Sequence, residues 1–303
     1  MTSPQAGVFA SNDRYQYHLE FSVGPSTDKN AVREALRTAL ANTETAQSDG
    51  PIETVLSFGP ELWSCFSSDM KPTGLEDFQS IAGPKHHAPA TQGDLWIWIQ
   101  SDQHDRNWEL AHDIRRSMPS GVKLTLDQPT FVYKNSLDLM GFVDGTANPK
   151  GDARFPVAQI PDGSPGAGGS LALTQRWVHD LESFEQLTIE QQALIIGRTK
   201  IEDEELQGDE MPPDSHVSRT DVSVDGIAQK IWRRSTPFGD TKEHGLHFVA
   251  FACEQSRFQI QLERMFGVTD DGMRDRITDF SMAVTGSYWF TPCVEDLQHT
   301  LRT

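Results

Sequence analysis

Cysteine is scarce in this 303-residue chain. The three that are present, Cys65, Cys253 and Cys293, lie far apart and form no CxxC pair. An odd number of widely spaced cysteines gives no support to a disulfide framework or to a thiolate zinc site. The cysteine content therefore indicates a reducing compartment, and we expect a cytoplasmic protein.

Long apolar runs and positive charge are also in short supply. No stretch approaches the roughly 20 apolar residues that a membrane helix needs, and residues 1–15 lack the basic start and apolar segment of a secretory signal. The 26 Lys and Arg against 44 Asp and Glu give a net charge of -18, which repels nucleic-acid backbones and anionic membranes. We therefore expect neither nucleic acid nor a membrane as a partner.

What is present is enough apolar material for a folded protein of two parts. Hydrophobic residues make up 37% of the chain, and its length is near the size at which one core gives way to two. Residues 141–169 are rich in Gly, Pro and Asp, which is typical of irregular backbone. We place the boundary there and predict domains at residues 1–150 and 151–303.

The first half alternates strand-like and helix-like segments. Residues 15–23 alternate with period two, which indicates a strand, and residues 28–40 follow as an amphipathic helix. Further elements are predicted in the order strand, strand, helix, strand, at residues 54–58, 94–99, 103–118 and 124–133. This is the split-βαβ pattern of a ferredoxin-like module, in which helices cover one face of an antiparallel sheet.

The second half repeats this pattern loosely, without sequence identity between the halves. Its predicted strands are residues 170–178, 229–234, 245–253 and 284–290, and its predicted helices are residues 189–196 and 258–265. The chain is therefore predicted to be an α+β protein of two ferredoxin-like modules, with helices packed on antiparallel sheets.

The string GFVDGTANP at residues 141–149 is the most unusual in the chain. Glycines on both sides of Phe-Val-Asp let the backbone turn sharply and approach a flat ligand closely, with the carboxylate of Asp144 held at the turn. The alternative is a structural turn in which Asp144 caps Thr146 and the following amides. The residues alone leave both interpretations open.

The chain has ten histidines, so a functional one has to be distinguished by its position and spacing. His216 lies in a loop, where it is a surface residue, a satisfied core residue or an axial ligand to haem iron. Two other pairs, His86 with His87 and His244 with His247, do not lie on a convincing helix with the i, i+4 spacing of a zinc site. His247 alternates with apolar neighbours in a predicted strand, so we expect it to point away from the core.

Two adjacent guanidiniums end the predicted strand at residues 229–234. Period two places Arg233 and Arg234 on opposite faces, so that one enters a pocket while the other meets solvent. A surface arginine pair is the alternative.

Several of these motifs occur together and in a recognisable order. The string at 141–149, IGRTK at 196–200, Ser215-His216, and RRS at 233–235 followed by PFG at 237–239 resemble the dye-decolourising peroxidase family. The resemblance is strongest to its short bacterial, YfeX-like branch. It covers nearly the whole chain, and it implies a fold of the dimeric α+β barrel-like superfamily.

The resemblance also implies a role for individual residues. His216 matches the proximal haem ligand, Asp144 and Arg233 match the distal pair, and Ser235 falls near the peroxide. Cofactor contacts are implied for a wider set: Arg198 towards a propionate, Gly145 and Thr146 in the distal loop, Leu246 and Phe248 on the apolar wall, and Asp279 on the second nitrogen of His216.

The activity that the resemblance implies is a haem peroxidase. It would hold one haem b per chain, reduce hydrogen peroxide, oxidise dyes, phenols or other small aromatic donors, and assemble as a homo-oligomer, dimeric or larger. Electrons would reach the haem through surface aromatic side chains, for which the candidates are Trp177, Trp232, Tyr288 and Trp289, each alternatively a packing residue. The other functions considered are a haem carrier or iron-releasing protein, and a haem-free ferredoxin-like binding protein.

Overall fold

The computed structural model describes residues 2–10 and 14–302. Residues 1, 11–13 and 303 lie outside the described part of the chain; they belong to the N-terminal stretch considered for a signal and to the ends of the two predicted domains. Among the described residues, no helix combines the length and the apolar character needed to cross a bilayer.

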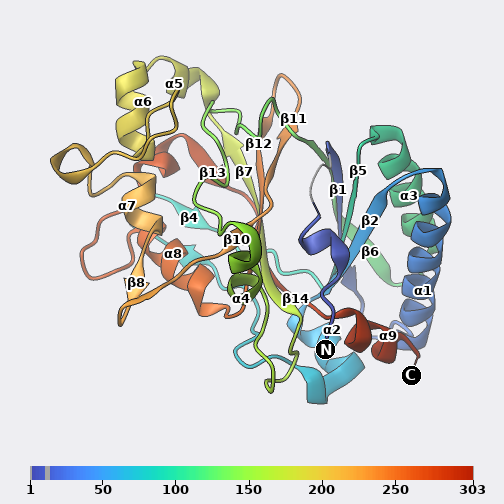
Figure 1. Cartoon of the computed structure of the whole chain (residues 1–303). Helices are drawn as coiled ribbons and strands as arrows, with labels where there is room; N and C mark the ends of the chain where they lie inside the picture. The colour runs from blue at the N-terminus through green and yellow to red at the C-terminus, as the bar shows by residue number, and fades with distance from the viewer. Residues whose placement is uncertain (1, 11–13, 303) are drawn as a thin grey trace.

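The N-terminal half is a ferredoxin-like module. Its strands run antiparallel in the order β2-β5-β1-β6, and helices α1 and α3 cover the outer face of the sheet (Figure 1). The elements are β1 (Tyr15–Val23), α1 (Lys29–Ala46), β2 (Ile52–Phe58), β5 (Leu95–Ser101), α3 (His104–Ser117) and β6 (Val122–Phe131). Helix α1 begins where predicted because the carboxylate of Asp28 accepts a hydrogen bond from the Asn30 amide.

The C-terminal half repeats the arrangement. Its antiparallel strands lie in the order β10-β12-β7-β14, with β11 also paired to β12. The elements are β7 (Ser170–His179), α6 (Ile189–Ile196), β10 (Trp232–Arg233), β11 (Thr236–Gly239), β12 (His244–Ala252), α8 (Ser256–Phe266) and β14 (Ser287–Thr291). The prediction of two ferredoxin-like modules in an α+β fold is therefore confirmed.

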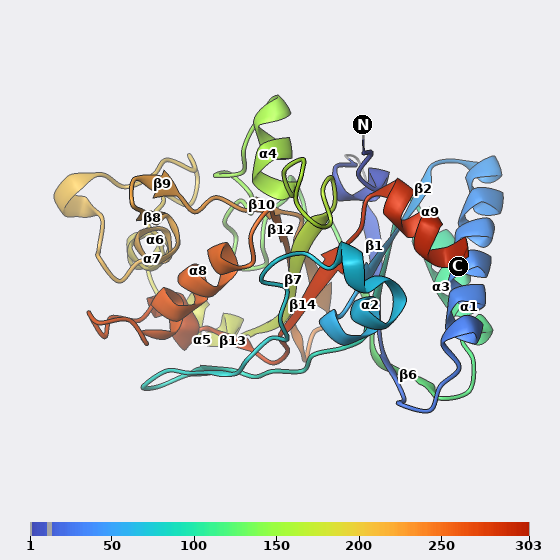
Figure 2. The ribbon, with the colours of Figure 1, turned by 90° about the horizontal axis from the view of Figure 1, so that it is seen from below.

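The two modules share one curled sheet. Strands β14 and β2 join through the pair Phe290 and Phe58, which makes a single ten-stranded sheet. At the other end β11 approaches β6, where the hydroxyl of Thr236 donates to that of Thr130 at 2.7 Å. The inner faces of the modules consequently meet, while the helices lie on the outside (Figures 1 and 2).

Two of the predicted strands are shorter than expected. The strand predicted at residues 284–290 begins only at Ser287, as β14, and a separate short strand, β13 (Ser281–Ala283), precedes it. Between the two, the hydroxyl of Thr285 accepts the hydrogen bond of the Arg176 amide and interrupts the ladder. The strand predicted at residues 229–234 shrinks to the two residues of β10.

Several short elements lie outside the predicted pattern. These are α2 (Pro60–Ser67), β3 (Ile81–Ala82), β4 (His87–Ala88), α4 (Arg154–Ala158), α5 (Leu181–Glu185), α7 (His216–Thr220), β8 (Ser223–Val224), β9 (Ile227–Ala228), the 3-10 turn η6 (Arg276–Asp279) and α9 (Val294–Arg302). Elements α7 and η6 carry side chains of the candidate site.

The predicted outward orientation of His247 is wrong. Its side chain is fully buried on the inner face of the curled sheet, and its ring lies against that of His18 with centroids 4.0 Å apart. Its neighbours Leu246 and Phe248 point to the opposite face, where the candidate site lies. The inner face is buried because the second module covers it, which the alternation within one strand does not reveal.

Candidate active site

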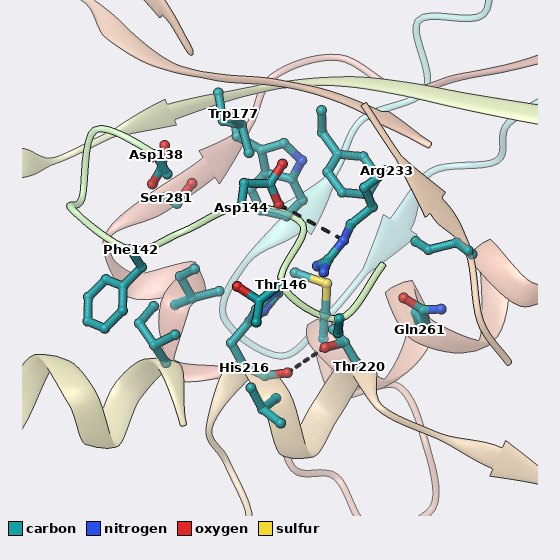
Figure 3. A pocket seen from close by; sticks show the side chains of 18 of the residues that line it. Asp138, Phe142, Asp144, Thr146, Trp177, His216, Thr220, Arg233, Gln261 and Ser281 are labelled. Atoms are coloured by element: carbon teal, nitrogen blue, oxygen red, sulfur yellow. Dashed lines mark hydrogen bonds and ion pairs between the residues drawn. The ribbon is translucent and has the colours of Figure 1, made fainter. Parts of the chain in front are cut away.

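A cavity of about 200 Å³ lies on the helix-covered face of the C-terminal sheet. One wall is apolar, and β7, β12 and α8 supply its side chains: Leu173, Trp177, Leu246, Phe248, Phe258 and Leu262. Polar groups gather on the other sides, from the loop after β6, from α7 and from β10 (Figure 3). The predicted wall residues Leu246 and Phe248 both border this cavity.

His216 opens helix α7 and borders the cavity. Ser215 precedes it as the N-cap, with a hydroxyl that accepts the hydrogen bond of the Ser218 amide. Nδ1 of His216 is 2.7 Å from Oδ2 of Asp275, a residue with no exposed surface. Since a carboxylate accepts, Nδ1 carries the proton and Nε2 is the nitrogen with a free lone pair. This is the arrangement of a metal-ligating histidine held by a carboxylate.

The prediction that Asp279 supports His216 is wrong. Asp279 stands at the far end of η6 and faces another cluster, in which Lys85, His86 and Arg274 contact its carboxylate at 2.6, 2.9 and 2.7 Å. Burial acts to raise the pKa of Asp279, but these hydrogen bonds outweigh it and lower the pKa to about 2. Asp275 occupies the N-cap of the same turn, where its Oδ1 also accepts from the Ile277 amide.

Asp144 and Arg233 lie across the cavity from His216 (Figure 3). The Nε of Arg233 is 4.0 Å from Oδ1 of Asp144, and both side chains are about one-fifth exposed. Asn148 joins the two segments, since its amide group accepts from the Arg233 backbone N–H and donates to the Arg233 carbonyl, each at 2.9 Å. The string at residues 141–149 thus brings its carboxylate to the arginine as part of one hydrogen-bonded unit.

The other predicted site residues are spread around the cavity rim. Arg198 borders the cavity, and its guanidinium binds Asp203 at 2.8 Å and Glu205 at 2.9 Å. Thr146 also borders it and donates to Asp203 at 2.5 Å. Gly145 has a φ of 87°, which its neighbours in the turn require and which glycine adopts without strain.

Ser235 borders a second cavity of about 40 Å³, and its hydroxyl accepts from the Val249 amide at 3.4 Å. Asp144 borders both this cavity and the larger one, so Ser235 and Asp144 share the smaller cavity.

Sequence reasoning missed several residues of this site. Two of them lay close to residues already singled out: Asn148 is within the string at residues 141–149, and Asp275 is four residues before Asp279. No such signal pointed to Gln175. It is fully buried, borders the cavity, and neither its amide nitrogen nor its amide oxygen has a partner in the described part of the chain.

The four aromatic residues considered as an electron path are packed within the fold. Tyr288 and Trp289 are 2% and 0% exposed, Trp177 stacks on Phe266 and borders the cavity, and Trp232 is partly buried beside Phe9. Electrons transferred through these side chains would therefore pass through the interior of the protein.

Comparison with known proteins agrees with this geometry. The family profiles described as "Dyp-type peroxidase, N-terminal" and "Dyp-type peroxidase, C-terminal" match residues 5–131 and 135–296. A dye-decolorizing peroxidase from Mycobacterium tuberculosis is 36% identical over 252 residues, which are 82% of this chain and 75% of the relative. One from Rhodococcus erythropolis is 34% identical, covering 82% and 74%.

Solved structures show the same likeness. A variant of Rhodococcus jostii DypB in complex with haem superposes with a TM-score of 0.90 at 32% identity, covering 97% of each chain. A dye-decolorizing protein from V. cholerae superposes with a TM-score of 0.91 at 32% identity, covering 97% of this chain and 99% of the other.

The fold and the site together define an oxidoreductase of the peroxidase class. An apolar pocket with a carboxylate-held histidine, faced by a carboxylate and an arginine, has the side chains that peroxide chemistry requires. The chain belongs to the dye-decolourising peroxidase family.

Proposed function

We propose that the protein uses haem to reduce hydrogen peroxide and to oxidise dyes, phenols or other small aromatic donors. One observation carries this proposal: a histidine whose Nδ1 is fixed by the buried Asp275 faces an Asp–Arg pair across a single pocket. A haem carrier does not need the Asp–Arg pair, so the pair favours the peroxidase over the carrier.

The residues around the pocket fit a haem. His216 offers Nε2 to the iron, and the apolar wall suits the face of a porphyrin. Arg198, Thr146 and Gly145 lie towards its polar edge. A bound haem would supply the two-electron redox chemistry that no amino-acid side chain here provides. We propose haem b at one per chain, held in this pocket.

The distal side chains have distinct tasks in this proposal. Asp144 accepts a proton from one oxygen of hydrogen peroxide and returns it to the other, which lets that oxygen leave as water. Arg233 places a fixed positive charge where negative charge develops as the O–O bond breaks. Ser235, which lines the smaller cavity together with Asp144, is assigned to the same distal group. The apolar side chains on one wall of the cavity lower the local polarity, which strengthens both electrostatic effects.

The function is tested by an absorbance scan of the purified protein after expression with adequate haem. A Soret band together with peroxide-dependent oxidation of a dye or a phenol is expected. A Soret band without turnover would support a haem carrier instead, and the lack of any band after haem reconstitution would overturn the proposal.

Removal of either distal group should slow the reaction with peroxide while haem stays bound. We expect Asp144→Asn and Arg233→Ala each to lower the rate by about tenfold or more, since positioned acid–base and electrostatic groups contribute at least that much. Stopped-flow absorbance measures the rate. Asp113→Asn and Arg116→Ala, on the exposed face of α3, are the matched controls, and wild-type rates in both site variants would contradict the assignment.

The support of His216 by Asp275 should be visible in the electronic properties of the protein. An amide at position 275 accepts a weaker hydrogen bond, so the imidazole donates less electron density. Asp275→Asn is therefore expected to raise the reduction potential and to slow the peroxide reaction by about 10- to 100-fold. Spectroelectrochemical titration checks this. Asp279→Asn is the control, because Asp279 lies in the same turn and does not contact His216.

We also propose a cytoplasmic homo-oligomer built from domains at residues 1–150 and 151–303. The location is supported by Cys65, Cys253 and Cys293, which are all free thiols. The described surface includes large exposed apolar side chains that association would cover, among them Ile201 and Ile227 with exposures of 77% and 62%. The assembly is checked by light scattering, in which a mass of one chain would refute it.

A further inference from the structure

A second hydrogen-bonded group borders the cavity at the end away from Arg233 (Figure 3). It consists of Asp138 in the loop after β6, His179 at the end of β7 and Ser281 in β13. Nε2 of His179 is 2.9 Å from Oδ1 of Asp138, and its Nδ1 is 2.8 Å from the hydroxyl of Ser281. The side chain of His179 is only 3% exposed.

The directions of these hydrogen bonds follow from the groups involved. A carboxylate can only accept, so in the neutral ring Nε2 carries the proton and Nδ1 accepts from the Ser281 hydroxyl. Both ring nitrogens are therefore occupied by the protein. His179 is left with no nitrogen for a ligand in the cavity, and its effect must be exerted through Asp138.

Asp138 organises the loop that presents Asp144. Its Oδ2 accepts from the Met140 amide at 3.2 Å, its carbonyl accepts from the Gly141 amide at 2.8 Å, and its own amide donates to the Phe142 carbonyl at 2.8 Å. These bonds close the turn that leads into Asp144, two residues further on.

Two residues of this loop have an unfavourable backbone conformation. Lys134 and Ser136 have φ values of 47° and 64°, two of the four positive values among non-glycine residues of the described chain. Such conformations persist only where surrounding contacts fix them. The Asp144 amide donates to the carbonyl of Ser136 at 3.0 Å, so a change in this strained stretch would move Asp144 directly.

We infer that His179, oriented by Ser281, is a positioning residue for Asp144. It ties Asp138, the centre of the loop, to strand β7, and it thereby fixes the distance from the Asp144 carboxylate to Arg233. This inference rests on the proposed function, in which Asp144 transfers the proton of hydrogen peroxide. Peroxide reactivity then depends on a contact that touches neither peroxide nor iron.

The experiment compares His179→Leu with His179→Gln. Glutamine has one donor and one acceptor that can replace the two ring nitrogens, whereas leucine has neither. His179→Leu is expected to speed hydrogen exchange in residues 136–146 by about tenfold, measured without haem, and to slow the peroxide reaction by about tenfold. His179→Gln should recover most of both values, and Ser281→Ala, which leaves the bond to Asp138, should change them least.

A double-variant cycle shows whether the effect passes through Asp144. In the Asp144→Asn background, His179→Leu should change the peroxide rate by less than about twofold, because the group that it positions is already lost. A tenfold loss in both backgrounds, or unchanged exchange in the loop, would overturn the inference. Should His179→Leu fail to fold, Asp138→Ala removes the same contact from the loop side and is subject to the same criteria.

The outcome is separable from that of the proposed function. A wild-type protein that binds no haem or does not react with peroxide would refute the peroxidase. The exchange comparison on the haem-free protein would still decide whether His179 holds the loop.

Discussion

Replacement of His216 by alanine is expected to weaken haem binding by more than about 100-fold, beyond the loss typical of changing a group that only supports a ligand. His216 borders the cavity, and its hydrogen bond to Asp275 uses Nδ1, which leaves Nε2 for a ligand. His179, the other imidazole that borders the cavity, has both nitrogens occupied by Asp138 and Ser281. The ring of His179 therefore cannot take over.

Titration of the haem-free protein with haem, followed by the Soret band, measures this loss. His244→Ala, in the partly exposed start of β12, is the matched control and should bind haem like the wild type. Added imidazole should fill the space left in His216→Ala and restore a Soret band, because Asp275 remains to orient it. A five-coordinate Soret band of wild-type strength in the variant, without imidazole, would refute His216 as the ligand.

The fold was accessible from the sequence because its two modules follow local patterns. The strand at residues 15–23 and the helix at residues 189–196 have the predicted bounds. Alternation could not reveal that the polar face of β1 is also buried, since that depends on the packing of one module against the other. It also could not reveal the break at Thr285, where a side chain takes the place of a backbone acceptor.

The candidate site shows the same division between local and long-range information. The motifs that contain Asp144, His216 and Arg233 were found because each is local, and their shared order pointed to one pocket. The carboxylate partner of His216 was assigned to Asp279 although Asp275 holds it. The two residues lie at opposite ends of one 3-10 turn, and a position along the chain does not tell which end faces the pocket.

Among the described residues, His18, Glu20 and His247 are titratable side chains that are buried on the inner face of the sheet. Burial lowers the pKa of His18 well below its usual range, and the neighbouring His247 lowers it further. Burial, with a contribution from Arg176, lowers the pKa of His247 to about 3. Burial raises the pKa of Glu20 to about 7, although a hydrogen bond from Thr174 opposes it.

These groups make the free energy of unfolding depend on pH in opposite directions. Below about pH 6.5 the unfolded chain binds protons on both histidines while the folded protein does not, so stability is lost as the pH falls. For Glu20 the folded protein keeps a proton that the unfolded chain releases above 4.5, so stability is lost as the pH rises towards 7. Between these values Glu20 offsets one histidine, and below 4.5 both histidines act unopposed.

Glu20→Gln is therefore expected to stabilise the protein at pH 8 and to leave it unchanged near pH 4.5. The pKa difference between 4.5 and about 7 corresponds to a gain of at most about 3 kcal/mol at pH 8, a large share of the stability of an ordinary domain. Urea unfolding at intervals from about pH 4 to 8 measures it, with Glu44→Gln on the exposed side of α1 as the control. A gain that is the same at every pH would mean that the glutamine side chain simply packs better than that of Glu20. A gain that fades as the pH falls from 7 to 4.5 identifies the buried carboxyl as the cause.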